Sequence, residues 1–257
     1  MLLEVSGLTK SFGGVTAIAD LDFGVPEGLI YAVIGPNGAG KTTLFNLLSG
    51  LYRPDEGRVR FAGQDLSQRP PHQIARLGLS RTFQNLQIFF NLSVLENVMV
   101  GAHGRGRSGL VGALLRTPAM RREERRMRAW AWEALDGCGL GALAERPASA
   151  LPYGALKRLE IARALAAQPR LLLLDEPAAG LNDTETLALR DLIGRLRDQG
   201  ITLLLVEHHM DLVMAVADRL LVLDYGSRLA EGTPAAIRAN PAVIAAYLGG
   251  EVHYAVE

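Results

Sequence analysis

The segment from 35 to 42 has the residue types and spacing of a phosphate-binding loop. It consists of a glycine, four intervening residues and then Gly-Lys-Thr. The glycines allow backbone N–H groups to approach phosphate oxygens, the lysine can reach the β- and γ-phosphates of a nucleotide, and the threonine can offer a hydroxyl to Mg²⁺. The predicted phosphate-binding residues are Gly35, Pro36, Asn37, Gly38, Ala39, Gly40, Lys41, Thr42 and Thr43. Thr42 is also a predicted magnesium ligand. A chance glycine-rich turn is the alternative.

Two acidic residues, Asp175 and Glu176, directly follow the apolar run from 171 to 174. Ligands bind at the edge of a parallel sheet formed by the carboxyl ends of its strands, so both carboxylates are expected beside the phosphate loop. We predict that Asp175 holds Mg²⁺ and that Glu176 polarises the water that attacks the γ-phosphate. The alternative is that the two acids only end the strand and cap the turn that follows.

Three further side chains are candidates for the same site. His208 follows the apolar run from 201 to 206, where it could donate to the γ-phosphate and orient the attacking water. The amide of Gln84 could sense Mg²⁺ or that water, so we include it as a candidate catalytic and magnesium residue. Phe12 lies upstream of the loop, where an aromatic ring could stack on adenine. The alternatives are a structural histidine, a glutamine without a role and a core aromatic.

A second turn has the chemistry of an anion site. Leu151, Pro152, Tyr153 and Gly154 open a basic helix. The first amide groups of a helix have no partner within it, and the helix dipole favours negative charge there. We therefore predict that these four residues also bind phosphate. The chain already has one phosphate-binding loop, so this second turn is expected to form half of another nucleotide site.

The elements that must position these residues indicate an α/β fold. Apolar runs at 29–34, 171–174 and 201–206 are typical of strands buried on both faces of a parallel sheet, and a helix at 184–198 makes a β-α-β unit of the last two. Short alternating segments around the phosphate loop predict an antiparallel sheet beside it. We expect a nucleotide-binding core with an antiparallel β subdomain at 1–84 and 151–257, and an inserted helical subdomain at 85–150.

Composition limits the classes of protein that the chain can represent. Its 257 residues are 49% hydrophobic, and 27 basic residues balance 27 acidic ones. That balance provides no global field that would attract nucleic acid, so no nucleic-acid partner is expected. A single cysteine, Cys138, excludes an internal disulfide and fits a reducing compartment. No apolar stretch reaches the length of a membrane span, which indicates a cytoplasmic protein that is at most peripheral to a membrane.

Together these motifs resemble the ATP-binding subunits of ABC transporters over essentially the whole chain. They occur in the order of that family: Walker A at 35–42, Q-loop at Gln84, signature at 151–154, Walker B at 171–176, D-loop at 179–182 and switch histidine at His208. The resemblance implies a P-loop NTPase (RecA-like) fold that hydrolyses ATP with Mg²⁺. It also implies a head-to-tail pair with a second ABC ATPase subunit, homologous or identical, in which each signature closes over the ATP held by the other Walker A.

Finer features are similar to the larger ATPase subunit of branched-chain amino-acid importers. These features are Lys157–Arg163 after the signature, Glu207 before the switch histidine, and the ending Ala246-Tyr247-Leu248-Gly249. The resemblance implies transmembrane permease subunits as partners, a solute-binding protein as an indirect one, and work at the inner face of the cell membrane. The segment 84–92 would form part of a groove for a short cytoplasmic helix of the permease. Urea or amide uptake, export, or a soluble ABC ATPase are the alternatives.

The chain departs from the family pattern at three positions. Serine is usual where Pro152 stands, and its hydroxyl reaches the partner's γ-phosphate, so that hydrogen bond is lost here. Proline is tolerated at a helix start, and the Gly154 amide should remain available. Glutamine is usual at Ala155, and aspartate is common at His209, which puts the salt-bridge role of that position in doubt. We predict that the site completed by this signature is the weaker of the two.

Overall fold

A six-stranded sheet forms the centre of the computed structural model, which describes residues 1–82, 86–105 and 118–249. Its strands lie in the order β10, β9, β3, β8, β7, β6; β10 is antiparallel to β9, and the other neighbours are parallel. Their bounds are β3 Ile30–Ile34, β6 Leu79–Arg81, β7 Leu171–Asp175, β8 Thr202–Val206, β9 Arg219–Asp224 and β10 Ser227–Gly232. The carboxyl ends of the parallel strands therefore meet at one edge, where the predicted site residues follow them.

The central strands are buried on both faces, and for that reason they read as unbroken apolar runs. Side chains of a strand alternate between its two faces. In β3, Ile30, Ala32 and Ile34 belong to one buried cluster, and Tyr31 and Val33 belong to the other. The first cluster is shared with the helices on one face of the sheet. The second lies between this sheet and the antiparallel sheet.

The antiparallel sheet has the strand order β2, β1, β4, β5 within the described residues. Its strands are β1 Leu3–Phe12, β2 Val15–Val25, β4 Glu56–Phe61 and β5 Gln64–Asp65. Helix α1 (Lys41–Leu48) buries Leu44, Phe45 and Leu48 in the cluster between the two sheets. This position brings the amino-terminal end of α1 to the edge where β3 ends. The predicted antiparallel sheet beside the phosphate loop is confirmed.

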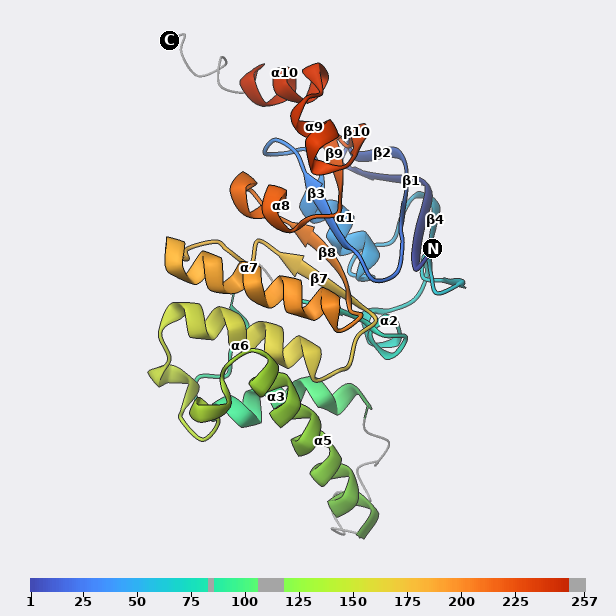
Figure 1. The fold of residues 1–257 in the computed structure, drawn as a ribbon. Helices are drawn as coiled ribbons and strands as arrows, with labels where there is room; N and C mark the ends of the chain where they lie inside the picture. The colour runs from blue at the N-terminus through green and yellow to red at the C-terminus, as the bar shows by residue number, and fades with distance from the viewer. Residues whose placement is uncertain (83–85, 106–117, 250–257) are drawn as a thin grey trace.

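The part of the chain between β6 and β7 is mainly helical where it is described. Its α-helices are α3 (Val94–Ala102), α5 (Pro118–Gly137) and α6 (Tyr153–Leu165), and α3 packs against the other two. Helix α3 begins with a capping box, in which Ser93 and Glu96 satisfy each other's backbone amides. In Figure 1 these three helices lie together at the end of the molecule opposite α9 and α10. The fold is the predicted P-loop NTPase core with an antiparallel β part and a helical region.

The remaining elements complete the core and its carboxyl end. Their bounds are α2 Pro71–Arg76, α7 Asp183–Asp198, α8 Met210–Val216, α9 Pro234–Arg238 and α10 Pro241–Gly249. The predicted β-α-β unit is confirmed, since α7 joins β7 to its parallel neighbour β8. A turn joins β9 to β10, and Tyr225 and Gly226 adopt positive φ angles there. Among the described residues, no helix combines the length and apolar character of a membrane span.

Candidate functional site

The phosphate loop wraps around the amino-terminal end of α1. Gly40 stands directly before the helix with φ 99°, and a Cβ there would collide with the backbone carbonyl of Ala17. The Nζ atom of Lys41 donates to the carbonyl oxygens of Gly35 at 2.7 Å and Pro36 at 2.8 Å. Burial lowers the pKa of the Lys41 ammonium, and the Glu176 carboxylate opposes that shift. The loop therefore holds the Lys41 ammonium in place at the amino-terminal end of α1.

Neighbouring turns fix the shape of this loop. The turn between β9 and β10 lies against it, because the Gly226 amide donates to the Ala39 carbonyl at 3.1 Å and the Ala19 amide donates to the Gly226 carbonyl at 3.0 Å. Thr42 is exposed and Thr43 is half-buried in the first turn of α1. The first amides of this helix lack partners within it, so they can bind phosphate oxygens.

Asp175 ends β7 as a buried carboxylate with 2% of its surface exposed. Its Oδ2 atom lies 2.7 Å from Nη2 of Arg81, and its amide donates to Oγ1 of Thr82 at 3.3 Å. A carboxylate and the Thr42 hydroxyl are hard oxygen donors, and Mg²⁺ is usually bound by one or two such groups together with phosphates and waters. These two residues therefore fit the predicted metal. Gln84, the third predicted ligand, lies outside the described residues.

The predicted base and the predicted switch histidine lie in contact. Nε2 of His208 is 3.2 Å from Oε1 of Glu176, and the two side chains are 45% and 19% exposed. Glu176 has a positive φ of 47°, and its amide donates to the Val206 carbonyl at 2.9 Å. A non-glycine residue in this region of φ is uncommon and is often found at functional sites. The backbone bond to β8 holds Glu176 beside the residues that follow that strand.

Glu207 has a positioning role that the sequence did not reveal. This residue is buried, and its Oε1 atom accepts from the Ala178 amide at 2.6 Å. Its Oε2 atom accepts from the amides of His208 at 2.9 Å and His209 at 3.2 Å. One carboxylate thus links the segment after Glu176 to the switch histidine. In the sequence, Glu207 is marked by its place directly after a buried strand and by the resemblance to the importer subunits, and neither indicates these contacts.

His209 stands directly before α8 as its N-cap residue. Its Nδ1 atom accepts from the Leu212 amide at 3.3 Å, so the imidazole caps the helix. A side chain in this position satisfies one of the helix's first amides. His209 therefore has a capping function at the start of α8.

The signature turn lies at the start of α6 and contacts the D-loop. Pro152 and Tyr153 are exposed, whereas Gly154 is buried beneath the Glu185 side chain, which leaves no room for a Cβ. The Tyr153 hydroxyl donates to the Ala179 carbonyl at 3.3 Å. Helix α6 forms directly after Pro152, as predicted. The remaining residue of the turn, Leu151, is buried. The signature and the D-loop therefore belong to one surface.

Phe12 lies on the surface at the end of β1, with 42% of it exposed. Its ring makes an edge-to-face contact with Tyr52, with ring centroids 5.2 Å apart, and the Lys10 ammonium lies 5.3 Å from its centroid. The alternative of a core aromatic is therefore wrong. An exposed ring of this kind is available for stacking on a base.

Tyr247 of α10 reaches the phosphate loop from the carboxyl end of the chain. Burial raises the pKa of its phenol to about 12, and the backbone of Gly35 beside the hydroxyl opposes this shift. No described group makes a well-formed hydrogen bond with that hydroxyl. The side chain packs against the buried cluster shared by the sheet and the helices. Tyr247 thus connects the Ala-Tyr-Leu-Gly segment at 246–249 to Gly35, the first residue of the phosphate loop.

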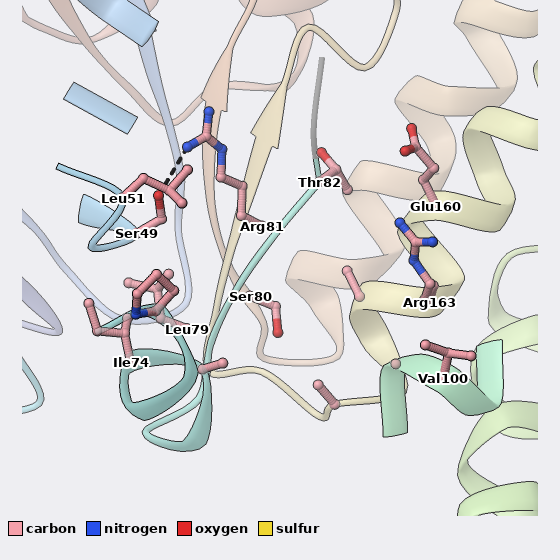
Figure 2. A pocket seen from close by; sticks show the side chains of 15 residues that line it. Ser49, Leu51, Ile74, Leu79, Ser80, Arg81, Thr82, Val100, Glu160 and Arg163 are labelled. Carbon is pink, nitrogen blue, oxygen red and sulfur yellow. Dashed lines mark hydrogen bonds between the residues drawn. The ribbon is translucent and has the colours of Figure 1, made fainter. Parts of the chain in front are cut away.

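A cavity of about 300 Å³ separates α2 and β6 from α3 and α6. Figure 2 shows Ile74 and Leu79 on one wall and Val100, Glu160 and Arg163 on the other. Nearby, Glu160 accepts from the Gln87 amide at 2.9 Å, and Arg163 donates to the Gln87 carbonyl. Helix α6 therefore holds the backbone at Gln87, three residues after Gln84.

Two aromatic side chains beyond this segment are exposed. Phe89 and Phe90 have 46% and 49% of their surfaces exposed, so they are not core residues. The Arg163 guanidinium lies 6.0 Å from the centroid of the Phe89 ring. An apolar surface of this kind beside a cavity can receive a partner.

Comparisons with known proteins agree with this geometry. Residues 18–179 match the family described as ABC transporter, and residues 227–253 match the family described as branched-chain amino acid ATP-binding cassette transporter. The chain is 47% identical to the high-affinity branched-chain amino acid transport ATP-binding protein BraF of Pseudomonas aeruginosa, with 96% of this chain and 98% of BraF covered. It is 48% identical to the corresponding protein LivG of Salmonella typhimurium, with the same coverage.

A solved structure leads to the same conclusion. The crystal structure of the ADP conformation of an ATP-binding cassette of an ABC transporter superposes with a TM-score of 0.84 and 32% identity, covering 96% of this chain and 98% of that one. The chain therefore belongs to the ABC transporter family, among the ATP-binding proteins of high-affinity branched-chain amino acid transport.

Proposed function

We propose that the chain is the ATP-hydrolysing subunit of a membrane ABC importer for branched-chain or related amino acids. The observation that carries this proposal is the contact between Glu176 and His208, 3.2 Å apart at the sheet edge where the phosphate loop also lies. A carboxylate and an imidazole in contact suit the activation of water for attack on a γ-phosphate. The names of BraF and LivG supply the class of solute.

The chain's own residues divide the chemistry among them. Lys41 and the amides of the phosphate loop bind the phosphates, and Phe12 stacks on adenine. Thr42, Asp175 and Gln84 would hold Mg²⁺, which would supply positive charge to neutralise the phosphates. Glu176 accepts a proton from the attacking water.

His208 completes the water-activating pair. It orients the water and the γ-phosphate beside Glu176. Glu207 keeps the backbone of this histidine in place through the hydrogen bond to its amide at 2.9 Å.

The second phosphate-binding turn acts on a partner's nucleotide. Leu151 to Gly154 close over the ATP held by a second ABC ATPase subunit in a head-to-tail pair, and the exposure of Pro152 and Tyr153 supports this role. Pro152 has no hydroxyl, so this half-site lacks the side-chain ligand that the serine form would provide. A lost hydrogen bond to a charged group costs about 1.5 to 3 kcal/mol. We therefore assign the weaker of the two sites to this signature.

The helical region transmits closure to the membrane. We infer that the core at 1–84 and 151–257 binds the nucleotide, whereas 85–150 moves with the permease. The cavity beside Arg163 and the exposed Phe89 and Phe90 support docking of a permease segment. The chain would then work at the inner face of the cell membrane, with a solute-binding protein as an indirect partner and no nucleic acid.

The test is to co-purify the chain with its membrane subunits, reconstitute the complex and measure ATP hydrolysis with candidate solutes. Leucine, isoleucine or valine should stimulate hydrolysis together with the solute-binding protein. Stimulation by urea or an amide alone would assign a different solute. Hydrolysis without any membrane partner or solute response would contradict coupling to transport.

A further inference from the structure

Arg81 is a buried cation at the centre of a network that joins three elements of the nucleotide site. Its Nη2 atom lies 2.7 Å from Oδ2 of Asp175, and the two side chains are 7% and 2% exposed. Its Nη1 atom donates to Oδ1 of Asn46 at 2.7 Å and to Oγ of Ser49 at 3.0 Å. Figure 2 shows Arg81 extending from β6 towards Ser49. The guanidinium thus connects the end of β7 to the helix that begins at the phosphate loop.

The guanidinium is also held from a third direction. It lies 5.6 Å from the centroid of the Phe45 ring, which is on the same helix as Asn46, and Ser49 caps the carboxyl end of that helix. A planar guanidinium presents donors in a rigid fork and can stack on an aromatic ring, whereas an ammonium cannot do both. Arg81 therefore has a fixed position that depends on α1 as much as on Asp175.

Thr82, the residue after Arg81, also forms a hydrogen bond with Asp175. Strand β6 pairs in parallel with β7, and the Thr82 amide donates to the Leu173 carbonyl at 2.9 Å. The Thr82 hydroxyl accepts from the Asp175 amide at 3.3 Å. Asp175 is thus held through its side chain by Arg81 and through its backbone by Thr82. Both residues stand immediately before the segment that contains Gln84.

We propose that Arg81 is a positioning residue for the magnesium site, where it fixes one oxygen of Asp175 and leaves the other for the cation that accompanies the nucleotide. The proposal rests on the nucleotide binding proposed above. Groups that orient a metal-binding carboxylate contribute strongly to metal affinity, and their loss costs about ten- to a hundredfold.

A competing role would make the opposite prediction. Arg81 could occupy the place of the cation and leave when the metal arrives. Two bonds to α1 and the contact with Phe45 oppose such a departure, since all three would have to break together. Removal of a positioning residue weakens metal binding, whereas removal of a competitor strengthens it.

The experiment measures binding of a non-hydrolysable ATP analogue to the full chain over a range of Mg²⁺ concentrations and in EDTA. Arg81→Met should raise the Mg²⁺ concentration at half-saturation by about ten- to a hundredfold. Binding in EDTA should stay near the wild-type value, because Lys41 and the loop amides hold the phosphates without the metal. With Mn²⁺ as the probe, the paramagnetic resonance spectrum of the bound ion should change in the same variant.

Two further variants keep the result interpretable. Arg170→Met removes an exposed ion pair with Glu27 and should leave every midpoint unchanged. Arg81→Lys keeps the charge but cannot reach Asp175 and both acceptors of α1, so it should raise the Mg²⁺ midpoint by a smaller factor. This variant carries the test if Arg81→Met does not fold.

Three results would overturn the role of Arg81. They are an unchanged Mg²⁺ midpoint in both variants, a lowered midpoint, and an equal loss of binding with and without metal. The last would assign Arg81 to general stability. If the wild-type chain bound no magnesium nucleotide at all, the proposed function itself would also fall.

Discussion

Nε2 of His208 lies 3.2 Å from Oε1 of Glu176, and the two residues follow neighbouring parallel strands. The register explains this contact. Asp175 is opposite Val206, so the residues after each strand emerge side by side at the sheet edge. Such a contact makes the base and the histidine one unit rather than two independent groups. Their effects on the rate should therefore be non-additive.

Glu176→Gln tests the base. The amide keeps the size of the side chain but accepts no proton, so hydrolysis by the assembled complex should fall by about 10²- to 10⁴-fold. ATP affinity should be retained, and the closed pair should accumulate. The measurements are single-turnover hydrolysis and nucleotide binding. Glu27→Gln, an exposed surface residue, is the control; rapid turnover by Glu176→Gln would refute the assignment.

Glu207→Gln tests the residue that positions the histidine. The carboxylate accepts three backbone amides, whereas a glutamine would place its own N–H₂ against one or two of them. A mismatched buried group costs about 1 to 3 kcal/mol, which urea unfolding would report. The hydrolysis rate should fall more than ATP affinity. Exposed Glu133→Gln should change neither quantity, and an equally stable and active Glu207→Gln would contradict this role.

Gly154→Ala tests the packing of the signature turn. A Cβ there would collide with Glu185, whose Oε2 atom accepts from the Asn182 amide at 3.1 Å as part of the capping box of α7. Loss of that hydrogen bond would cost about 1 kcal/mol of unfolding free energy, which offsets the gain in helix propensity that alanine brings at this position of α6. Gly194→Ala in α7, the helix whose start Glu185 caps, is the control, because nothing lies within 4 Å of its new Cβ. It should instead stabilise by about 0.5 to 1 kcal/mol. The reverse order in thermal unfolding would disprove this packing argument.

Glu160→Gln tests the cost of a buried carboxylate in α6. Burial raises the pKa of Glu160. The hydrogen bond from the Gln87 amide and the positive charges of Lys157 and Arg163 act in the opposite direction but are weaker. A carboxyl group whose pKa is raised in the folded state stabilises the fold fully below its unfolded-state pKa of 4.5. That stabilisation is lost as the pH rises through the folded-state pKa. Glutamine cannot titrate and still accepts from Gln87. The unfolding free energy of the variant relative to the wild type should therefore increase from about pH 4 to pH 7.

Glu96→Gln provides a control of opposite sign for that pH series. Bonds from Ser93 lower the pKa of Glu96, so its stabilising contribution is present above 4.5 and is lost as the pH falls. Relative to the wild type, this variant should become less stable as the pH rises. Parallel pH trends in the two variants would show that neither carboxyl has the environment described.

The placement of three candidate site residues could be predicted from single strands. Asp175, Glu176 and His208 each come after an apolar run, and the edge of a parallel sheet brings such residues together. Arg81 could not be assigned in this way, because its contacts are with Asn46 and Ser49, and Glu207 follows β8 but its contact with Ala178 arises only in the fold. These partners are distant in sequence, and no local pattern joins them.

The elements that the sequence left unpredicted are short. Strand β6 has three residues and helix α2 has six, which is too few to show a clear hydrophobic period. Their structure depends on pairing with β7 and on packing beside the cavity. Tertiary contacts thus determine the elements around the Gln84 segment, whereas local pattern suffices for the long strands and helices.

Pro152→Ser tests the asymmetry between the two nucleotide sites. Pro152 is exposed at the start of α6 and its side chain makes no capping bond, so serine can replace it without disturbing the core. Serine would cap the helix and add a hydroxyl toward the partner's phosphate, which strengthens the closed state by about 1.5 to 3 kcal/mol. The ATPase rate of the assembled complex should change, and ATP should be retained longer at the partner's site. Pro152→Ala separates the loss of proline from the gain of a hydroxyl. If serine and alanine gave the wild-type rate alike, the signature of this chain would not limit the partner's site.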